Sequence, residues 1–426
     1  MKQKRLYQYI APNILAMVGI SCYILADTFF IATAQGTNGI TALNLALPIY
    51  GIIFAIGSMI GTGSAIRYAL AKATDQQEAK KYFSNALIWD VIVSVIFIAA
   101  GLFFPGQVMR VMGADTVIES IGIPYTRIVL CFTPFFMMNY AFTAFVRNDN
   151  APHIAMAATL LSSLFNIVFD YVFMFPLGMG MTGAALATAV SPIVSILICM
   201  VHYLSPKSSV SFHFMVPSVK MLISSCSLGV VAFVGEIASA VTTMVFNFVL
   251  LGLDGNTAVA AYGVIANTAL VGTAIFNGVS QGLQPLASEA HAKGEAEEKK
   301  ILTKSVLTGI VLAVVLIGGV WIFAPQITDV FNSEHSEQLA AYAVPGIRIY
   351  FAGFFAAAIN IIFAGFLSAT DHAKESSIVA ISRGIVAIIA FALILPKFLG
   401  ITGVWLAFPA AEVLTLFVAL VISKKN

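Results

Sequence analysis

The chain has 426 residues, of which 59% are hydrophobic and 10% are charged, and its net charge is +2 at pH 7. Soluble globular domains carry roughly 25% charged residues, so this composition excludes a soluble fold. The nearly neutral charge, with no basic stripe, also argues against nucleic acid as a partner.

Twelve apolar runs are long enough to cross a hydrocarbon core of about 30 Å as helices. They cover residues 6–34, 42–70, 83–104, 119–145, 153–174, 182–204, 219–251, 258–288, 301–323, 340–368, 377–395 and 402–422. Most Lys, Glu and Asp residues lie in the short segments between them. The sequence therefore predicts an all-α polytopic membrane protein with twelve transmembrane helices.

Positive residues predict the orientation, because Lys and Arg stay preferentially on the cytoplasmic side. Successive loops lie on alternate sides of the membrane. Nearly all Lys and Arg of the predicted loops fall on one side, and only Arg110 and Lys397 lie on the other. We therefore expect a multi-pass protein of the cell (cytoplasmic or inner) membrane, in contact with lipid, with both termini in the cytoplasm. The basic start and long apolar run of the chain are expected to form the first span rather than a secretory signal.

The two halves of the chain resemble each other at a shift of about 220 positions. Pro124-Tyr125-Thr126-Arg127-Ile128 aligns with Pro345-Gly346-Ile347-Arg348-Ile349, and Gly180-Met181-Thr182-Gly183 aligns with Gly400-Ile401-Thr402-Gly403. Since six helices return the chain to the same side, the two lobes should be related by a pseudo-two-fold axis along the membrane normal. The predicted parts are a first lobe (1–204), a cytoplasmic linker (205–218) and a second lobe (219–426).

Carboxylates inside the spans are hypotheses for function, because an ionisable group at membrane depth is costly unless it is paired or hydrated. Asp27 and Asp170 both fall towards the outer end of their helices. Asn166 precedes Asp170 by one helical turn, so both side chains share a face, and Thr188 reaches a similar depth. These oxygens suit Na⁺, and crowded carboxyls of this kind equally suit a proton. The alternative is that each acid only links neighbouring helices by hydrogen bonds.

The repeat favours an ion site confined to the first lobe, since Asp27 aligns with Asn247 and Asp170 with Ala390. In the second lobe, Glu236 either neutralises a cationic substrate or is a satisfied structural acid, and Glu412 is expected to be structural. Asp90 is a further, weaker candidate. The residues predicted to line a substrate cavity are Glu236, Asn247, Asn360, Met59 and Met138. Pro12 should bend the first span, because proline removes a helical hydrogen bond.

Other classes of function lack their residue patterns. The sequence has no GxxxxGK[ST] loop and no HExxH, its six histidines lie mostly at span ends, and its four cysteines form no CxxC pair. We therefore expect no enzyme, no catalytic residues, no cofactor, and no metal beyond Na⁺ as a coupling ion. A channel is less expected, because two lobes in one chain need no further copies, and we expect a monomer.

Several motifs follow one another in the order of a known family. They are Ala26-Asp27-Thr28-Phe29-Phe30-Ile31, Ala42-Leu43-Asn44-Leu45-Ala46-Leu47-Pro48, Gly61-Thr62-Gly63-Ser64-Ala65, Asn166-Ile167-Val168-Phe169-Asp170 and Gly183-Ala184-Ala185-Leu186-Ala187-Thr188. With them, the chain resembles the multidrug and toxin extrusion (MATE) transporters over nearly its full length. Its first half is most similar to the bacterial branches related to DinF and MepA.

The resemblance implies two six-helix lobes and export of bulky, often cationic drugs by alternating access, driven by inward H⁺ or Na⁺. It implies a first-lobe cation site made of Asp27, Asn139, Asn166, Asp170 and Thr188, with Pro12 as the hinge of the first span. The chain departs from another branch of the family in having no acid in its tenth span, where Asn360 is the nearest polar group. A flippase for lipid-linked or other amphiphilic compounds in the same superfamily is the alternative.

Overall fold

The computed structural model describes residues 3–72, 75–331 and 336–423, and it contains helices and no strands in these ranges. The chain divides into two compact units, Met1–Phe233 and Val234–Asn426, which we call unit 1 and unit 2. Unit 1 holds α1 (Gln3–Lys72), α2 (Gln76–Phe103), α3 (Pro105–Val111), α4 (Thr116–Cys131), α5 (Thr133–Asn148), α6 (Pro152–Met174), α7 (Gly180–Tyr203) and the start of α8 (Val219–His291). Unit 2 holds the rest of α8, then α9 (Glu295–Phe331), α10 (Glu337–Ala352), α11 (Phe354–Ala369), α12 (Ala373–Ile381), the π-helix η1 (Ser382–Val386), α13 (Ala387–Ile394) and α14 (Pro396–Ser423).

The helices confirm the predicted polytopic fold. Ten helical segments of the described chain are long and apolar enough to cross a membrane, and two bent helix pairs bring the number to twelve. Each of the twelve overlaps one predicted run. Two spans lie within α1, at Leu6–Gln35 and Ala42–Lys72, and two within α8, at Val219–Gly255 and Thr257–His291. The latter pair is separated by a break at which Gly255 has a φ of +66°, which glycine adopts without a steric penalty.

The two bent pairs occupy equivalent places in the two halves. The axes of α4 and α5 differ by 47°, and those of α10 and α11 by 42°. The first bend precedes Pro134, which lacks the N–H that would continue the helix. The second lies at Gly353, whose missing Cβ would stand 2.9 Å from Pro409 Cα. The bends therefore support the internal repeat, although hydropathy predicts each pair only as one continuous span, 119–145 and 340–368.

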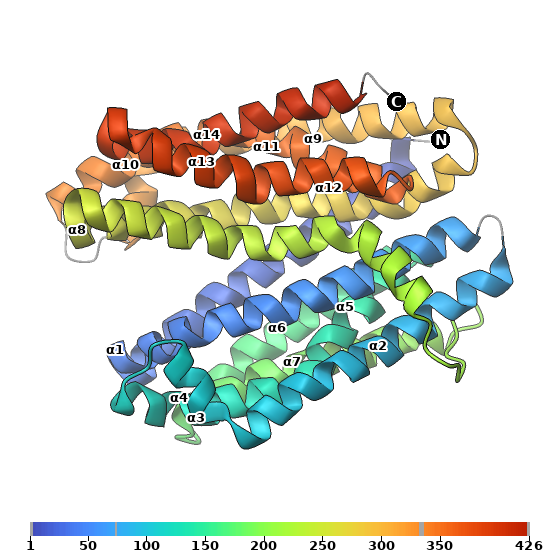
Figure 1. Ribbon diagram of the computed structural model, residues 1–426, viewed down its shortest axis with the longest axis horizontal. Coiled ribbons are helices and arrows are strands. Elements are labelled where there is room, and N and C mark those ends of the chain that lie inside the picture. The colour runs from blue at the N-terminus through green and yellow to red at the C-terminus, as the bar shows by residue number, and fades with distance from the viewer. Residues whose placement is uncertain (1–2, 73–74, 332–335, 424–426) are drawn as a thin grey trace. The chain divides into compact units, whose positions relative to one another are not determined.

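Helices of unit 1 pack closely through small residues. α1 packs against α2, α5 and α6, and α6 packs against α7 (Figure 1). A Cβ added to Gly57 would lie 2.8 Å from Met137 Cα, and one added to Gly61 would lie 2.5 Å from Ala141 N. Two glycines four positions apart thus let the backbones of α1 and α5 approach, as small residues commonly do in membrane helices.

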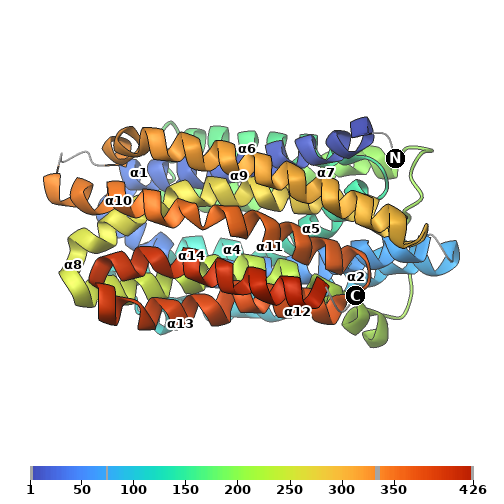
Figure 2. The same ribbon diagram turned by 90° about the horizontal axis from the view of Figure 1, so that it is seen from above.

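Unit 2 is built in the same manner from side-by-side helices. α9 packs against α10 and α11, and α14 packs against α10, α11 and α13 (Figure 2). The stacked rings of Tyr350 and Phe408, 4.3 Å between centroids, join α10 to α14.

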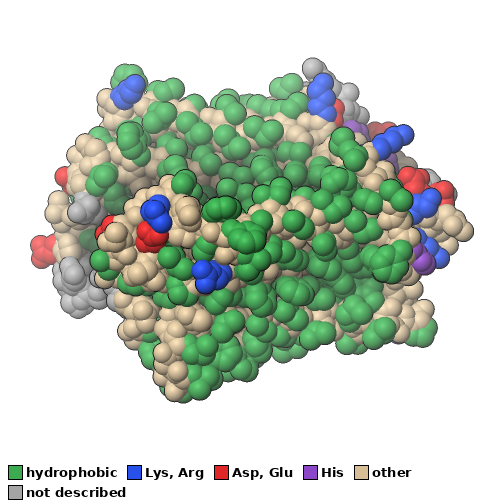
Figure 3. Space-filling model, turned by 60° about the horizontal axis from the view of Figure 1, so that its bottom comes forward, with side chains coloured by type: hydrophobic (Ala, Val, Ile, Leu, Met, Phe, Trp, Pro, Cys, Tyr) green, Lys and Arg blue, Asp and Glu red, His purple; other side chains and the backbone are tan. Residues whose placement is uncertain are grey.

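On the face that Figure 3 displays, hydrophobic side chains cover the middle and most charged side chains lie towards the two ends, as expected for helices that end in water.

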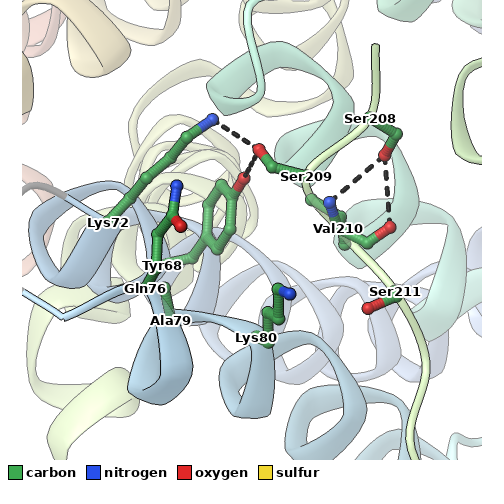
Figure 4. A pocket seen from close by; sticks show the side chains of 9 residues that line it. All are labelled: Tyr68, Lys72, Gln76, Ala79, Lys80, Ser208, Ser209, Val210 and Ser211. Carbon is green, nitrogen blue, oxygen red and sulfur yellow. Dashed lines mark hydrogen bonds between the residues drawn. The ribbon is translucent and has the colours of Figure 1, made fainter. Parts of the chain in front are cut away.

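The segment after α7 is tied to unit 1 through the buried carboxylate of Asp149, which is 3% exposed. Asp149 Oδ1 accepts hydrogen bonds from Tyr68 Oη and Lys72 Nζ, each at 2.6 Å. Its Oδ2 accepts the Ser209 N–H at 2.9 Å and lies 2.9 Å from His202 Nε2. Figure 4 shows that Tyr68 and Lys72 also both reach the hydroxyl of Ser209, at 2.9 and 2.6 Å. One carboxylate therefore joins α1, α7 and the predicted linker.

The surroundings of Asp149 act on its pKa in opposite directions. Burial alone would raise the pKa, but hydrogen bonds from Lys72, Ser209, Tyr68 and His202 outweigh it and lower the pKa to about 2. A cavity of about 180 Å³ adjoins the cluster, between the start of α2 and residues 208–211 (Figure 4). The carboxylate is thus held ionised at the place where the predicted linker is bonded to the unit.

Candidate functional site

Three packed helices of unit 1 bring four of the predicted site residues into its interior. Asp27 lies on α1, Asn166 and Asp170 lie one turn apart on α6, and Thr188 lies on α7. All four side chains are buried, and Asp170 has no exposed surface. Asn166 Nδ2 donates to Thr188 Oγ1 at 3.2 Å, which joins α6 to α7. The shared face of Asn166 and Asp170, which the helical spacing predicts, is therefore turned inward.

The two carboxyl groups are near each other and short of hydrogen-bond donors. Asp27 and Asp170 interact electrostatically. Among the described residues, no donor serves Asp27 Oδ1 or either oxygen of Asp170, and no ion pair joins either acid to a Lys or Arg. The Asn166 Oδ1 next to them also lacks a partner. Buried oxygens of this kind are normally satisfied, so their geometry suits a small cation or a proton.

Asn139 lies on α5 and is half-buried. Its Oδ1 is enclosed and has no partner among the described groups, and its backbone oxygen accepts from Thr143 Oγ1 at 2.8 Å. No contact described in the structure joins Asn139 to Asp27 or Asp170. Its place in the cation site, which came from the family resemblance, stays a prediction.

Two tyrosines of the same interior were missed by sequence reasoning. Tyr50 Oη donates to Tyr125 Oη at 3.1 Å, and both side chains are buried. Both lie within electrostatic reach of Asp27 and Asp170. The available signal was a phenol in the interior of two spans, and it was overlooked because Tyr is commonest at membrane interfaces. The polar interior of unit 1 therefore includes hydroxyl groups from α1 and α4.

The remaining first-half candidates differ in environment. Pro12 is buried within α1, and the helix continues past it, so its role as a hinge stays a prediction. Met59 and Met138 are half-buried on α1 and α5. Asp90 on α2 is fully buried, and neither carboxylate oxygen has a partner among the described residues. Asp90 is thus a further buried acid of unit 1, and it belongs to a different helix from the Asp27 and Asp170 pair.

The second-half candidates do not form one group. Glu236 and Asn247 are half-buried on α8. Asn360 is fully buried, and its Nδ2 donates to Glu412 Oε2 and to the Glu412 backbone oxygen, both at 2.8 Å. Glu412 is in turn paired with Arg383, 2.7 Å between Oε1 and Nη2. Asn360 Nδ2 is thus engaged by Glu412, while its Oδ1 has no partner among the described residues, and its place in a substrate cavity stays a prediction.

Comparisons with known proteins agree with this architecture. The family model described as MatE matches residues 12–172 and 232–394. Multidrug export protein MepA of Staphylococcus saprophyticus is 25% identical over 424 residues, which cover 98% of this chain and 93% of that protein. The protein of the same name from Staphylococcus aureus strain MRSA252 is 24% identical over 422 residues, with the same two shares.

Solved structures show the same fold. An outward-facing multidrug resistance MATE family transporter of the MOP superfamily matches with a TM-score of 0.92 at 20% identity, over 99% of this chain and 95% of that one. A MOP superfamily transporter from Pyrococcus furiosus matches with a TM-score of 0.91 at 20% identity, over the same shares. Since the family model covers most of the chain in two separate matches, one in each half, this chain belongs to the MatE family of membrane transporters for multidrug export.

Proposed function

We propose that this transporter is a cation-coupled antiporter, driven by H⁺ or Na⁺, that exports bulky, often cationic organic compounds by alternating access. The observation that carries the proposal is the buried, mutually interacting pair Asp27 and Asp170, in which Asp27 Oδ1 and both oxygens of Asp170 lack a donor among the described residues. A desolvated charge is costly until a counter-ion arrives, so the affinity of this pair for a cation depends on its surroundings. The names of the curated relatives, which are multidrug exporters, support the class of substrate.

Coupling follows if the ion neutralises the pair in only one of two conformations. A ligand shifts a conformational equilibrium only by the difference between its affinities for the two states. One elementary charge that moves down 100 mV supplies about 2.3 kcal/mol, which sustains a substrate gradient of roughly 40-fold. A modest difference in ion affinity is therefore sufficient. We place the protein, as a monomer, in the cell membrane with both termini in the cytoplasm.

The test is uptake of a fluorescent organic cation into everted membrane vesicles, driven by either a Na⁺ gradient or a pH gradient. The intact protein should accumulate the compound with one of the two gradients. Asp27→Asn and Asp170→Asn should each abolish gradient-driven uptake, because the amide carries no charge for the ion to cancel. Binding of the compound to purified protein, measured by fluorescence polarisation, should survive in both variants.

The matched control is Asp115→Asn, which changes an acid to its amide outside the spans. Asp115 caps α4 by accepting the N–H groups of Val117 and Ile118, and asparagine caps as well. Its uptake should equal that of the intact protein. Full gradient-driven uptake by the Asp27→Asn/Asp170→Asn double variant would contradict the proposal, and uptake that ignores both gradients would favour a flippase.

A further inference from the structure

A closed polar cluster lies in unit 2, where three helical segments converge. Arg383 lies in the π-helix η1 between α12 and α13, Glu412 on α14 and Asn360 on α11. Only 2% of the Glu412 side chain is exposed, against 16% of that of Arg383. Tyr350 of α10 lies within electrostatic reach of both charges. A carboxylate and a guanidinium are thus largely buried together among the helices of unit 2.

The Glu412 carboxylate is saturated by donors. Its Oε1 accepts from Arg383 Nη2 at 2.7 Å and Nε at 3.1 Å. Its Oε2 accepts from Asn360 Nδ2 at 2.8 Å and from Arg383 Nε at 3.3 Å. Guanidinium and carboxylate match as planar, two-pronged partners, and the arginine cannot release its proton under ordinary conditions. Each carboxylate oxygen thus already accepts two hydrogen bonds, and the one oxygen of the cluster without a partner among the described residues is the uncharged Asn360 Oδ1.

The backbone is deformed where it presents the arginine. The Ala387 N–H bonds to Ser382 O, five residues back, which makes the wide turn of a π-helix. Such turns are rare and frequently occur at functional sites, because they redirect side chains along one helix. The irregular turn carries Arg383, whose side chain reaches Glu412.

Unit 1 shows the contrasting arrangement. Asp27 and Asp170 have no guanidinium or ammonium partner among the described side chains, and three of their oxygens lack donors. Asp27 and Asp170 of unit 1 therefore have no positive side chain of the protein paired with them in the described ranges, whereas Glu412 of unit 2 is paired with Arg383.

We propose that Arg383 is a built-in counter-cation that permanently occupies Glu412, and so confines binding of the coupling ion to unit 1. The proposal rests on the proposed function for the identity of the process, and it adds the residue that determines how many ions are coupled. Removal of Arg383 leaves Glu412 as a buried acid without a counter-charge, which must take up a proton or another cation. The second unit would then respond to the coupling ion.

The charge state of Glu412 is tested by labelling with dicyclohexylcarbodiimide, a lipophilic reagent. The protonated carboxyl gives its proton to a nitrogen of the reagent, its oxygen bonds to the central carbon, and an oxygen-to-nitrogen acyl shift yields a stable N-acylurea. Purified protein is treated in Na⁺-free buffer, and mass spectrometry quantifies the peptide containing Glu412. We expect little label in the intact protein, at least about tenfold more in Arg383→Met, and little in Arg383→Lys, which keeps a positive charge.

A second readout is the number of ions per substrate, taken from the substrate gradient that a series of ion gradients sustains in proteoliposomes. Arg383→Met should raise this number, and Arg383→Met/Glu412→Gln should restore it. The double variant also contains no unpaired buried charge, so it folds even where Arg383→Met does not.

Strong labelling of Glu412 in the intact protein would overturn the proposal, whatever the variants do. An unchanged labelling or ion number in folded Arg383→Met would overturn it as well and would make the pair purely structural. A failure of the proposed function would give a different result. The substrate gradient of the intact protein would then not depend on any ion gradient, while labelling of Glu412 would still increase in Arg383→Met.

Discussion

The hydroxyl of Tyr50 orients the phenol of Tyr125 beside the two acids of unit 1. Tyr50→Phe retains the ring and removes one buried hydrogen bond, which contributes roughly 0.5–1.5 kcal/mol. Because the Tyr125 hydroxyl near Asp27 and Asp170 then loses this partner, we expect the ion concentration for half-maximal transport to rise by up to about tenfold. Initial rates of uptake in everted vesicles over a series of ion concentrations measure this change.

The control for Tyr50→Phe is Tyr82→Phe on α2. The Tyr82 hydroxyl donates to Glu78 one turn away, at 3.3 Å, and the residue has no described contact with the acids. Its ion dependence should be that of the intact protein. If both variants shift equally, the Tyr50 hydroxyl has no specific place in ion binding.

At the scale of single residues, the sequence predicted what depends on rarity and on spacing within one helix. Asp27 and Asp170 are conspicuous because carboxylates are scarce in apolar runs, and the one-turn spacing placed Asn166 beside Asp170. The sequence of a single helix does not determine which of its faces contacts a helix distant in the chain. The bond between Tyr50 and Tyr125 and the pairing of Arg383 with Glu412 depend on such meetings, so they required the structure.

Close packing of α1 on α5 depends on Gly61. In Gly61→Ala the new Cβ would stand 2.5 Å from Ala141 N, a backbone atom that cannot move aside alone. Overpacking of a tight contact costs typically 1–3 kcal/mol, so we expect a lower midpoint of thermal unfolding in detergent. Size-exclusion chromatography after heating to a series of temperatures measures the loss of monodisperse protein.

Gly51 offers a matched control on the same helix. A Cβ added there meets no atom within 4 Å, and alanine favours a helix over glycine by about 1 kcal/mol. Gly51→Ala should therefore leave the midpoint unchanged or raise it. A lower midpoint in Gly51→Ala than in Gly61→Ala would refute the packing argument.

The Asp149 cluster predicts how the anchoring of the linker depends on pH. The pKa of Asp149 is lowered from 3.8 to about 2 in the folded protein, so the unfolded chain binds the proton more tightly. The stabilisation is complete above pH 3.8 and is lost as the pH falls towards 2. It amounts to at most about 2 kcal/mol, because Lys72 is partly exposed and solvent screens the pair. Thermal midpoints of the intact protein should fall over this range.

Asp149→Asn should have a lower midpoint at neutral pH and a smaller decrease between pH 4 and 2, since the difference between the two proteins isolates this carboxylate. Asp75→Asn provides the comparison, because Asp75 only caps α2 by accepting the N–H groups of Gln77 and Glu78. Equal acid dependence in Asp149→Asn and the intact protein would show that Asp149 is not the group that titrates.

At the scale of elements, hydropathy predicted all twelve spans because a long apolar run has few other stable environments. Hydropathy did not predict the bends between α4 and α5 and between α10 and α11, because it contains no information on the direction of a helix axis. Pro134 was a local signal for the first bend, whereas Gly353 owes its place to the close approach of Pro409, which only the fold reveals. The short helix α3 was also not predicted, because its seven residues are too few for a periodic pattern.

The orientation of the whole molecule is a prediction from the distribution of Lys and Arg. Single cysteines at Lys207 and Lys397, both exposed, should lie on opposite sides of the membrane. In a background with the four native cysteines changed to serine or alanine, a membrane-impermeant maleimide added to intact cells should label Lys397→Cys and not Lys207→Cys. In everted vesicles Lys207→Cys should be labelled and Lys397→Cys should not. Labelling of Lys207→Cys in intact cells would show that the orientation is opposite to the predicted one.

The start of α8 lies after the repeat junction, yet it packs with unit 1. There the backbone of Met59 leaves no room for a side chain at Gly229, and the backbone of Ser225 leaves none at Gly63. The predicted repeat divides the chain within residues 205–218, whereas the compact units divide it between Phe233 and Val234. A fragment that ended within 205–218 would therefore hold the whole predicted first lobe and still lack the residues of α8 that pack in unit 1. Two halves produced as separate chains from that boundary would complete unit 1 only if the second half supplied the start of α8.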